Sequence, residues 1–244
     1  MSARSVMASL LLGRRSARAA GRDLVRWCGL FGIAPGTARV ALHRMTAAGE
    51  LRRDDCDYVL VGGLARRQEE QEASLTPRRR AWRGSWRVAL VVADARPAPV
   101  RTGTRAALRR SRLAEWREGV WLRPDNIEID EMPHCEWLDA QPDADPVALA
   151  ARLFAPARWR GEAERLVDAV ETATVRLRDD AERALAPAFL AGAAALRHVR
   201  ADPLLPNELV PQPWPGAALR DAYVTYQREF ASVARAWFRD QSAS

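Results

Sequence analysis

Apolar residues recur at helical spacing three times near the start of the chain. The first run covers residues 5–12 and ends at a glycine, and a similar run covers residues 22–31. A third begins at Pro35, a residue suited to the first turn of a helix, and continues to about Gly49, a residue suited to a left-handed helix end. The pattern predicts three short helices, the last two joined by a tight turn.

The next segment changes from helical spacing to short strands. Residues 51–53 and 58–61 flank a polar tip rich in aspartate, which is typical of a β-hairpin. Two helices joined by a tight turn and followed by a basic hairpin are the layout of a winged helix-turn-helix. We therefore predict a DNA-binding domain of this kind at residues 1–63.

A step of about 100° per residue divides the third helix into an apolar and a cationic face. The positions predicted to face the core are Ala38, Ala41, Leu42 and Met45. The opposite face is small and polar, as a helix must be to reach base edges in the major groove, where arginine can bond guanine twice. The candidate DNA-binding residues are Thr37, Arg39, Val40, His43 and Arg44, with Arg52 and Arg53 at the hairpin as phosphate contacts.

A charged connector, residues 64–84 and helical in its first part, precedes a second region of mixed pattern. Its triple arginine at 78–80 is a further candidate for phosphate contacts, although such a run is commonly a solvated linker. Residues 85–155 then alternate strand and helix signals, predicted at residues 86–93 (strand), 104–117 (helix), 119–124 (strand), 135–138 (strand) and 145–154 (helix). This order is typical of a ferredoxin-like α+β domain.

The remaining residues, 160–244, are predicted to form a helical domain for effector binding or dimerisation. Helical spacing covers residues 162–200, with Val175 and Leu190 among the expected core residues and Pro187 as a break or start. Core positions in the same stretch are Leu166, Val167, Val170, Leu177, Phe189 and Leu196. A proline-rich segment and a final helix, whose aromatic residues are expected in the core, complete an α+β, mostly helical chain.

Composition agrees with a folded, soluble protein. The chain has 244 residues, of which 48% are hydrophobic and 28% charged, and no run of eighteen apolar residues predicts a membrane span. The start of the chain lacks the pattern of a signal peptide, and three widely spaced cysteines fit a reducing compartment, so we expect a cytoplasmic protein. No residue pattern calls for a cofactor.

Charge is distributed unevenly. All 38 basic residues are arginine, and 23 of them lie in the first 112 residues beside only 9 acidic residues. The rest of the chain carries 15 arginines and 22 acidic residues. This asymmetry indicates that the front half meets a polyanion such as double-stranded DNA.

Two other classes remain open from the residues alone. Asp94 follows the first strand of the middle region, where small ferredoxin-like metal nucleases place a catalytic carboxylate, but no second metal ligand lies near it in sequence. A basic three-helix module can also serve as a protein-interaction adaptor, with a solvated cationic face and no preference for DNA.

Short motifs along the chain resemble, in the same order, those of the PaaX-type transcriptional repressors of phenylacetate catabolism. The N-terminal motifs that carry the likeness are 3–13, 31–33, 38–45, 49–51 and 58–60. The later motifs are Trp82 with Trp86, then 119–124, 202–206 and 214–216, and the last two are the most specific.

The resemblance implies a homodimer that represses transcription on operator DNA and is released by an aryl-acetyl-CoA thioester such as phenylacetyl-CoA. It implies the same three-domain order, with an effector site in the helical C-terminal domain. The candidate effector contacts are Arg197, His198, Arg200 and Trp214. A structural role is the alternative: Arg200 would pair with Asp202 or cap a helix, and Trp214 would hold the proline segment.

Overall fold

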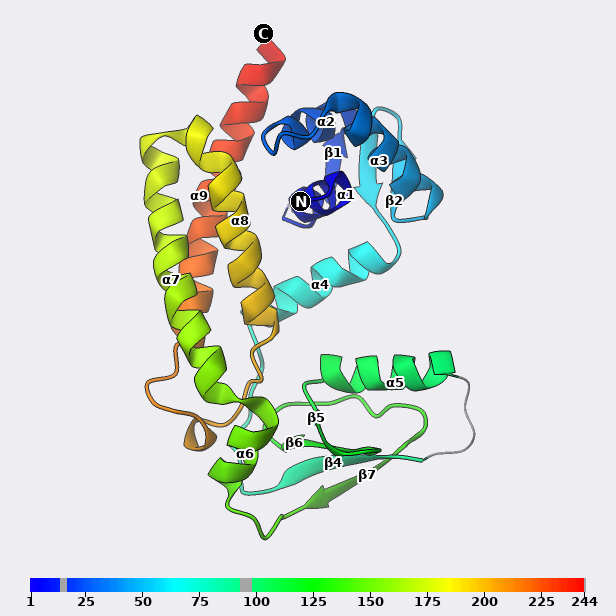
Figure 1. Cartoon of the computed structure of the whole chain (residues 1–244), viewed down its shortest axis with the longest axis vertical. Coiled ribbons are helices and arrows are strands. Elements are labelled where there is room, and N and C mark those ends of the chain that lie inside the picture. Colours follow the sequence, from blue (N-terminus) through cyan, green and yellow to red (C-terminus); the bar gives the residue numbers. More distant parts are fainter. Residues whose placement is uncertain (14–16, 93–97, 244) are drawn as a thin grey trace. The chain divides into compact units, whose positions relative to one another are not determined.

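The computed structural model describes residues 1–13, 17–92 and 98–243, and it is an α+β, mostly helical structure with two small antiparallel sheets (Figure 1). The chain forms two compact units. Unit 1 contains Met1–Thr76, Ala163–Arg200 and Ala217–Ser244, and unit 2 contains Pro77–Glu162 and Ala201–Gly216. Unit 1 therefore groups the N-terminal residues with helices from the last third of the chain, and the domain boundaries drawn from the sequence remain a prediction.

The N-terminal part of unit 1 contains three helices and a three-stranded sheet. The helices are α1 (Ala3–Leu12), α2 (Gly21–Gly29) and α3 (Pro35–Ala47), and the strands are β1 (Arg18–Ala20), β2 (Leu51–Asp54) and β3 (Asp57–Leu60). The sheet order is β1-β3-β2, with antiparallel pairing throughout. The helices and hairpin match the sequence pattern, whereas β1 is too short to show an alternating signal.

Helix α4 (Gly63–Leu75) occupies the first part of the segment predicted as a connector. Its side chains Gln71 and Ser74 are buried, and the Ser74 carbonyl accepts a 3.1 Å hydrogen bond from Nε of Arg220. The segment is polar in sequence, yet its inner side is covered by α1 and α8. Polar composition alone therefore did not reveal that this helix is packed.

Three long helices complete unit 1: α7 (Pro156–Asp179), which begins in unit 2, α8 (Ala181–Arg200) and α9 (Gly216–Ala243) (Figure 1). The predicted break at Pro187 was wrong, because the helices separate at Asp180 and α8 continues through the proline. Buried neighbours on both sides of Pro187 hold that turn of helix in place and override its low helix propensity.

Two residues predicted to lie in the core of these helices are exposed. Val175 is 54% exposed because the buried stripe of α7 runs through Thr174 and Leu177 on either side of it. Leu190 is 45% exposed beside the buried Phe189. The helical spacing identified the helices correctly but misassigned residues at the margin of the buried stripe.

An aromatic cluster joins α2 to the C-terminal helices inside unit 1. The fully buried ring of Trp27 has its centroid 5.7 Å from Phe189, 5.9 Å from Phe230, 5.8 Å from Trp237 and 5.7 Å from Phe238. Rings at these separations interact favourably in addition to the area they bury. The aromatic residues of the last helix are therefore core residues, as their spacing predicted.

Unit 2 is built on a four-stranded antiparallel sheet in the order β5-β6-β4-β7. Its strands and helices are β4 (Trp86–Val91), α5 (Ala98–Arg110), β5 (Ala114–Arg117), β6 (Val120–Pro124), β7 (Cys135–Ala140), α6 (Pro146–Phe154) and the 3-10 helix η1 (Asn207–Leu209). Ala89 and Trp121 pack with Leu108 of α5, and their neighbours Val88 and Leu122 pack with Leu149 of α6. Alternate residues of each central strand thus face two separate apolar clusters.

The predicted helix at residues 104–117 was too long. Helix α5 ends at Arg110, the chain turns at Arg112 with a φ of 61°, and residues 114–117 form β5. Trp116, which lies within the predicted helix, is 43% exposed on this strand. Four residues are too few for spacing to separate a strand from the end of a helix.

Candidate nucleic-acid interface

Helix α3 is fixed at both ends by local backbone geometry. Ala34 is extended, with φ −60° and ψ 143°, as the residue before a proline prefers, and Pro35 forms the first turn. Gly49 follows the helix with a φ of 67°, a conformation that favours glycine. The sequence thus determines where this helix begins and ends.

The buried side of α3 matches the prediction closely. Ala38, Leu42 and Met45 are buried, whereas Ala41 is only partly buried. These residues pack α3 against α1 and α2. The rest of the helix surface is left to solvent.

The exposed side of α3 brings together the helical residues predicted to bind DNA. All five are exposed: Thr37, Arg39, Val40, His43 and Arg44. Within the described ranges, the guanidinium groups of Arg39 and Arg44 form no ion pair, so both remain available to an incoming anion. Val40 is 51% exposed and offers a methyl surface between them. This face can bond base edges and phosphates at once.

The hairpin places its two arginines differently. Arg52 and Arg53 are both exposed on β2, but successive residues of a strand point to opposite faces. Nε of Arg53 donates a 2.9 Å hydrogen bond to the carbonyl of Asp55 at the tip. DNA can therefore contact both arginines at once only along the edge of β2. The sequence did not indicate this restriction.

Acidic residues near this surface are paired within the module. Arg18 lies 3.0 Å from Asp54 and 2.5 Å from Asp57, and its hydrogen bond to Asp57 raises the pKa of the guanidinium. Arg4 pairs with Glu50, and this hydrogen bond lowers the pKa of the Glu50 carboxyl. The carboxylates of Glu50, Asp54 and Asp57 are thus compensated, which favours the approach of an anion to the cationic face.

The four predicted effector contacts divide between the two units. Arg197, His198 and Arg200 lie in the last turn of α8 in unit 1, whereas Trp214 lies in unit 2. Arg200 forms its ion pair with Glu70 at 3.1 Å, whereas the structural alternative had named Asp202 as its partner. Trp214 stacks on Trp159 with a centroid distance of 4.6 Å and an interplanar angle of 18°. Trp214 thus serves packing of the proline-rich segment.

Buried polar groups hold the 202–206 motif in unit 2. The amide of Leu204 donates to the Asp202 carboxylate at 2.8 Å, and Arg79 lies 3.7 Å from the same carboxylate. Nη2 of Arg123 and Nδ2 of Asn126 donate to the Leu204 carbonyl at 3.2 and 2.8 Å. These contacts account for the motif structurally.

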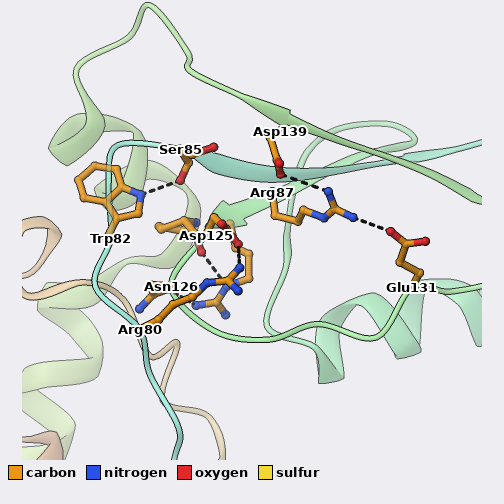
Figure 2. A network of polar contacts seen from close by, with 10 residues as sticks. Arg80, Trp82, Ser85, Arg87, Asp125, Asn126, Glu131 and Asp139 are labelled. Atoms are coloured by element: carbon orange, nitrogen blue, oxygen red, sulfur yellow. Dashed lines mark hydrogen bonds and ion pairs between the residues drawn. The ribbon is translucent and has the colours of Figure 1, made fainter.

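The triple arginine at 78–80 is also partly engaged within unit 2. Figure 2 shows Arg80 bonded to Asp125, beside Asn126 and near the Trp82–Ser85 contact. The Trp82 indole donates to the Ser85 carbonyl at 2.6 Å, and Arg87 bonds Glu131 at 2.7 Å on the same sheet. Arg79 and Arg80 therefore serve internal contacts, which reduces their availability to phosphate.

The alternative of a metal-dependent nuclease depends on Asp94. Asp94 lies outside the described residues, and the rest contains no group of three side chains able to hold a metal ion. Nor does any helix in the described ranges have both the length and the apolarity to cross a membrane.

A cavity of about 1330 Å³ in unit 1 was not predicted. It is lined by α1, α4, α8 and α9, and includes Arg197 and Arg200 together with Arg228, Arg235 and Tyr223. These helices are far apart in sequence, so no local motif could have identified the cavity. The early signal is the assignment of Arg197 and Arg200 as effector contacts, because both of them line the cavity.

Comparison with known proteins agrees with this arrangement. Residues 2–61 match the family model of the PaaX-like protein, and residues 157–240 match that of the PaaX-like protein C-terminal domain. The solved structure of the uncharacterized protein Rv0674 from Mycobacterium tuberculosis is 36% identical, with a TM-score of 0.72 over 96% of this chain and 98% of that chain. No protein with a curated function matches. The chain therefore belongs to the PaaX-like family, which indicates a transcriptional regulator.

Proposed function

We propose that the protein is a sequence-specific DNA-binding repressor that acts as a homodimer and is released by an aryl-CoA thioester such as phenylacetyl-CoA. The observation that carries the proposal is the exposed cationic face of α3, with Arg39 and Arg44 unpaired in the described structure. In this proposal α3 enters the major groove, Arg39, His43 and Arg44 read bases, and Thr37 and Val40 complete the contact surface. Arg52 and Arg53 hold the phosphate backbone.

The element order supports the two finer fold assignments in the proposal. Helices α1 to α3 followed by the β2–β3 hairpin correspond to a winged helix-turn-helix, and β4 lies between β6 and β7 in the order of a ferredoxin-like sheet. Two such DNA-binding modules related by dimer symmetry would contact half-sites about one helical turn apart. A thioester would release DNA by favouring a dimer with unmatched spacing.

The first test is fluorescence anisotropy of the full chain on the DNA upstream of its own gene, against a scrambled duplex, at about 150 mM salt. We expect preference for the native duplex, and loss of that preference when phenylacetyl-CoA is added. The double change Arg39→Ala with Arg44→Ala should weaken specific binding at least about 100-fold, because each bidentate base contact contributes about 1–3 kcal/mol. Arg176→Ala with Arg183→Ala, two exposed arginines outside α3, is the charge-matched control.

The outcomes separate the classes of function. If specific binding survives the double change in α3, the recognition face is wrong. If both duplexes bind equally and weakly, the protein-interaction adaptor becomes the better description. Specific binding that phenylacetyl-CoA leaves unchanged keeps the regulator and rejects this effector.

A further inference from the structure

Helix α5 of unit 2 carries a second cationic surface, which the contacts proposed above do not use. Four of its 13 residues are arginine and none is acidic. All four arginines are exposed: Arg101, Arg105, Arg109 and Arg110. The helix covers one side of the four-stranded sheet (Figure 1) and lies between the two regions that match the PaaX-like family, so these matches assign no role to it.

Packing against the sheet determines which side of α5 is exposed. Leu108 is fully buried in an apolar cluster with residues of the central strands. At about 100° per residue, Arg110 lies on the opposite side of the helix and Arg109 lies between the two. The positions between Arg109 and Arg110 around the helix are the small residues Thr102 and Ala106. An extended anion can therefore approach the helix closely between these two arginines.

Two of the arginines are held in place by the sheet. The guanidinium carbons of Arg105 and Arg109 lie 6.0 and 5.6 Å from the centroid of the Trp121 ring. Such a contact attracts the cation to the ring, and the guanidinium can still donate through its N–H groups. Because these side chains are already ordered, less conformational entropy is lost when they bind an anion.

The positive charge of this surface is only partly compensated. Arg105 forms an ion pair with Glu115 of β5. Arg109 and Arg110 form no ion pair within the part of the chain that the structure describes. Arg105 and Arg109 are four residues apart, a spacing at which like charges destabilise a helix. An anion that neutralises them is therefore favoured.

The composition of the surface selects the kind of anion. Trp121 is only 1% exposed, so it cannot stack an unpaired base as proteins that bind single strands do. Thr102 and Ala106 stand where a helix bound to a membrane surface would insert bulky apolar residues. Double-stranded DNA, with one negative charge per about 1.7 Å of its axis, suits a convex surface of point cations.

We propose that the exposed surface of α5, formed by Arg105, Arg109 and Arg110, binds the phosphate backbone of double-stranded DNA. The identity of this partner rests on the proposed function. Phosphate contacts carry no sequence information directly, so α5 adds affinity to any duplex, whereas α3 supplies the preference between duplexes.

The test measures binding of the full chain to the upstream duplex and to the scrambled duplex by fluorescence anisotropy, at salt concentrations from about 50 to 200 mM. The α5 variant is Arg109→Gln with Arg110→Gln. The control, Arg152→Gln with Arg158→Gln, removes the same charge from exposed positions of α6 and α7 in the same unit. A third protein, Arg109→Lys with Arg110→Lys, keeps the charge. Circular dichroism spectra establish that all of them are folded.

We expect the α5 variant to bind both duplexes at least about 10-fold more weakly at about 150 mM salt, by the same factor for each. The slope of log affinity against log salt should become shallower by about 2, since each phosphate contact contributes about 0.9. The control should change affinity less than about 3-fold. The lysine variant should stay within about 3-fold of the unchanged chain, because lysine also binds phosphate as a point charge.

Three results overturn the proposal. Equal binding by the α5 variant and the control would assign the surface to another polyanion, such as an acidic protein segment. A lysine variant as weak as the glutamine variant would mean that the loss follows from packing on Trp121 and not from charge. Loss of affinity for the upstream duplex alone would contradict a contact with the backbone, which both duplexes share.

The proposed function fails by a different result. If the unchanged chain shows no preference between the duplexes but the α5 variant weakens both, the sequence-specific regulator is overturned and the α5 contact is supported. If the preference is present and the α5 variant behaves like its control, the regulator is supported and the α5 contact is overturned. A chain that binds neither duplex overturns both.

Discussion

At the scale of single residues, the buried guanidinium of Arg123 is the feature least expected from sequence. It lies on β6 and is fully buried, although arginine is rarely buried in folded proteins. Its nitrogens donate to Asn126 Oδ1 at 2.9 Å and to the carbonyls of Leu204, Arg112 and Pro124 at 3.1 to 3.3 Å. Burial lowers the pKa of Arg123 to about 9, so the group remains charged at neutral pH. One side chain thus connects β6 to the proline-rich segment.

Replacing this residue should destabilise unit 2. Arg123→Met keeps most of the side-chain volume but leaves the Arg112 carbonyl and Asn126 Oδ1 without their donor. We expect a loss of about 3 kcal/mol in the free energy of unfolding, the usual cost of unsatisfied buried polar groups and of a broken buried charge network. Urea denaturation followed by tryptophan fluorescence reports mainly on unit 2, which holds seven of the nine tryptophans.

Arg80 provides the matched control for this measurement. It belongs to the same unit and pairs with Asp125, but its side chain is 56% exposed. Arg80→Met should therefore cost less than about 1 kcal/mol, as exposed ion pairs do. Equal losses for the two variants would show that burial of Arg123 is not what makes it important.

At the scale of elements, the contact between α8 and α9 depends on the absence of one side chain. Gly192→Ala would normally stabilise a helix, yet its Cβ would lie 2.2 Å from the buried Tyr226 ring. We expect a net loss of about 2 kcal/mol, since overpacking a tight contact outweighs the gain in helix propensity. Thermal denaturation followed by circular dichroism at 222 nm measures it.

Two further variants isolate the cause of that loss. Gly161→Ala on α7, with open space around its Cβ, should stabilise the protein by up to about 1 kcal/mol. In a Tyr226→Ala background, Gly192→Ala should cost nothing more, because the ring that it meets is gone. An additive loss in that background would place the strain elsewhere in the helix pair.

The elements also show how far sequence can predict this structure. The buried and exposed faces of α3 could be predicted from the spacing of its apolar residues, and its two ends from Pro35 and Gly49. Strands β1 and β5 could not, because three or four residues carry no reliable period. The burial of α4 could not be predicted either, because it depends on α1 and α8, which lie elsewhere in the chain.

The candidate sites differ in the same way. The exposed cationic face of α3 is a property of one helix and its turn, so the sequence places its residues together. The cavity combines four helices from both ends of the chain, and its arginines acquire a common role only through folding. Trp214, grouped with them on the strength of the motif, belongs to unit 2.

At the scale of the whole molecule, unit 1 joins residues from the first and last thirds of the chain around Trp27. The rings of α8 and α9 surround that side chain at centroid distances of 5.7 to 5.9 Å. Because Trp27 belongs to α2, its burial requires the C-terminal helices. The three N-terminal helices should therefore gain stability from residues about two hundred positions away, and unfold together with them.

Phe238→Ala tests this coupling. Removing a buried phenylalanine lowers the free energy of unfolding by about 3–5 kcal/mol. If unit 1 unfolds cooperatively, the amides of α3 should exchange through global unfolding at least about 100-fold faster. Hydrogen exchange measured by mass spectrometry would compare peptides of α3 and α9 in the same sample. Val175→Ala, at an exposed position on α7, should leave both unchanged. Faster exchange in α9 with unaltered protection in α3 would instead mean that the N-terminal helices α1 to α3 are stable without the C-terminal helices.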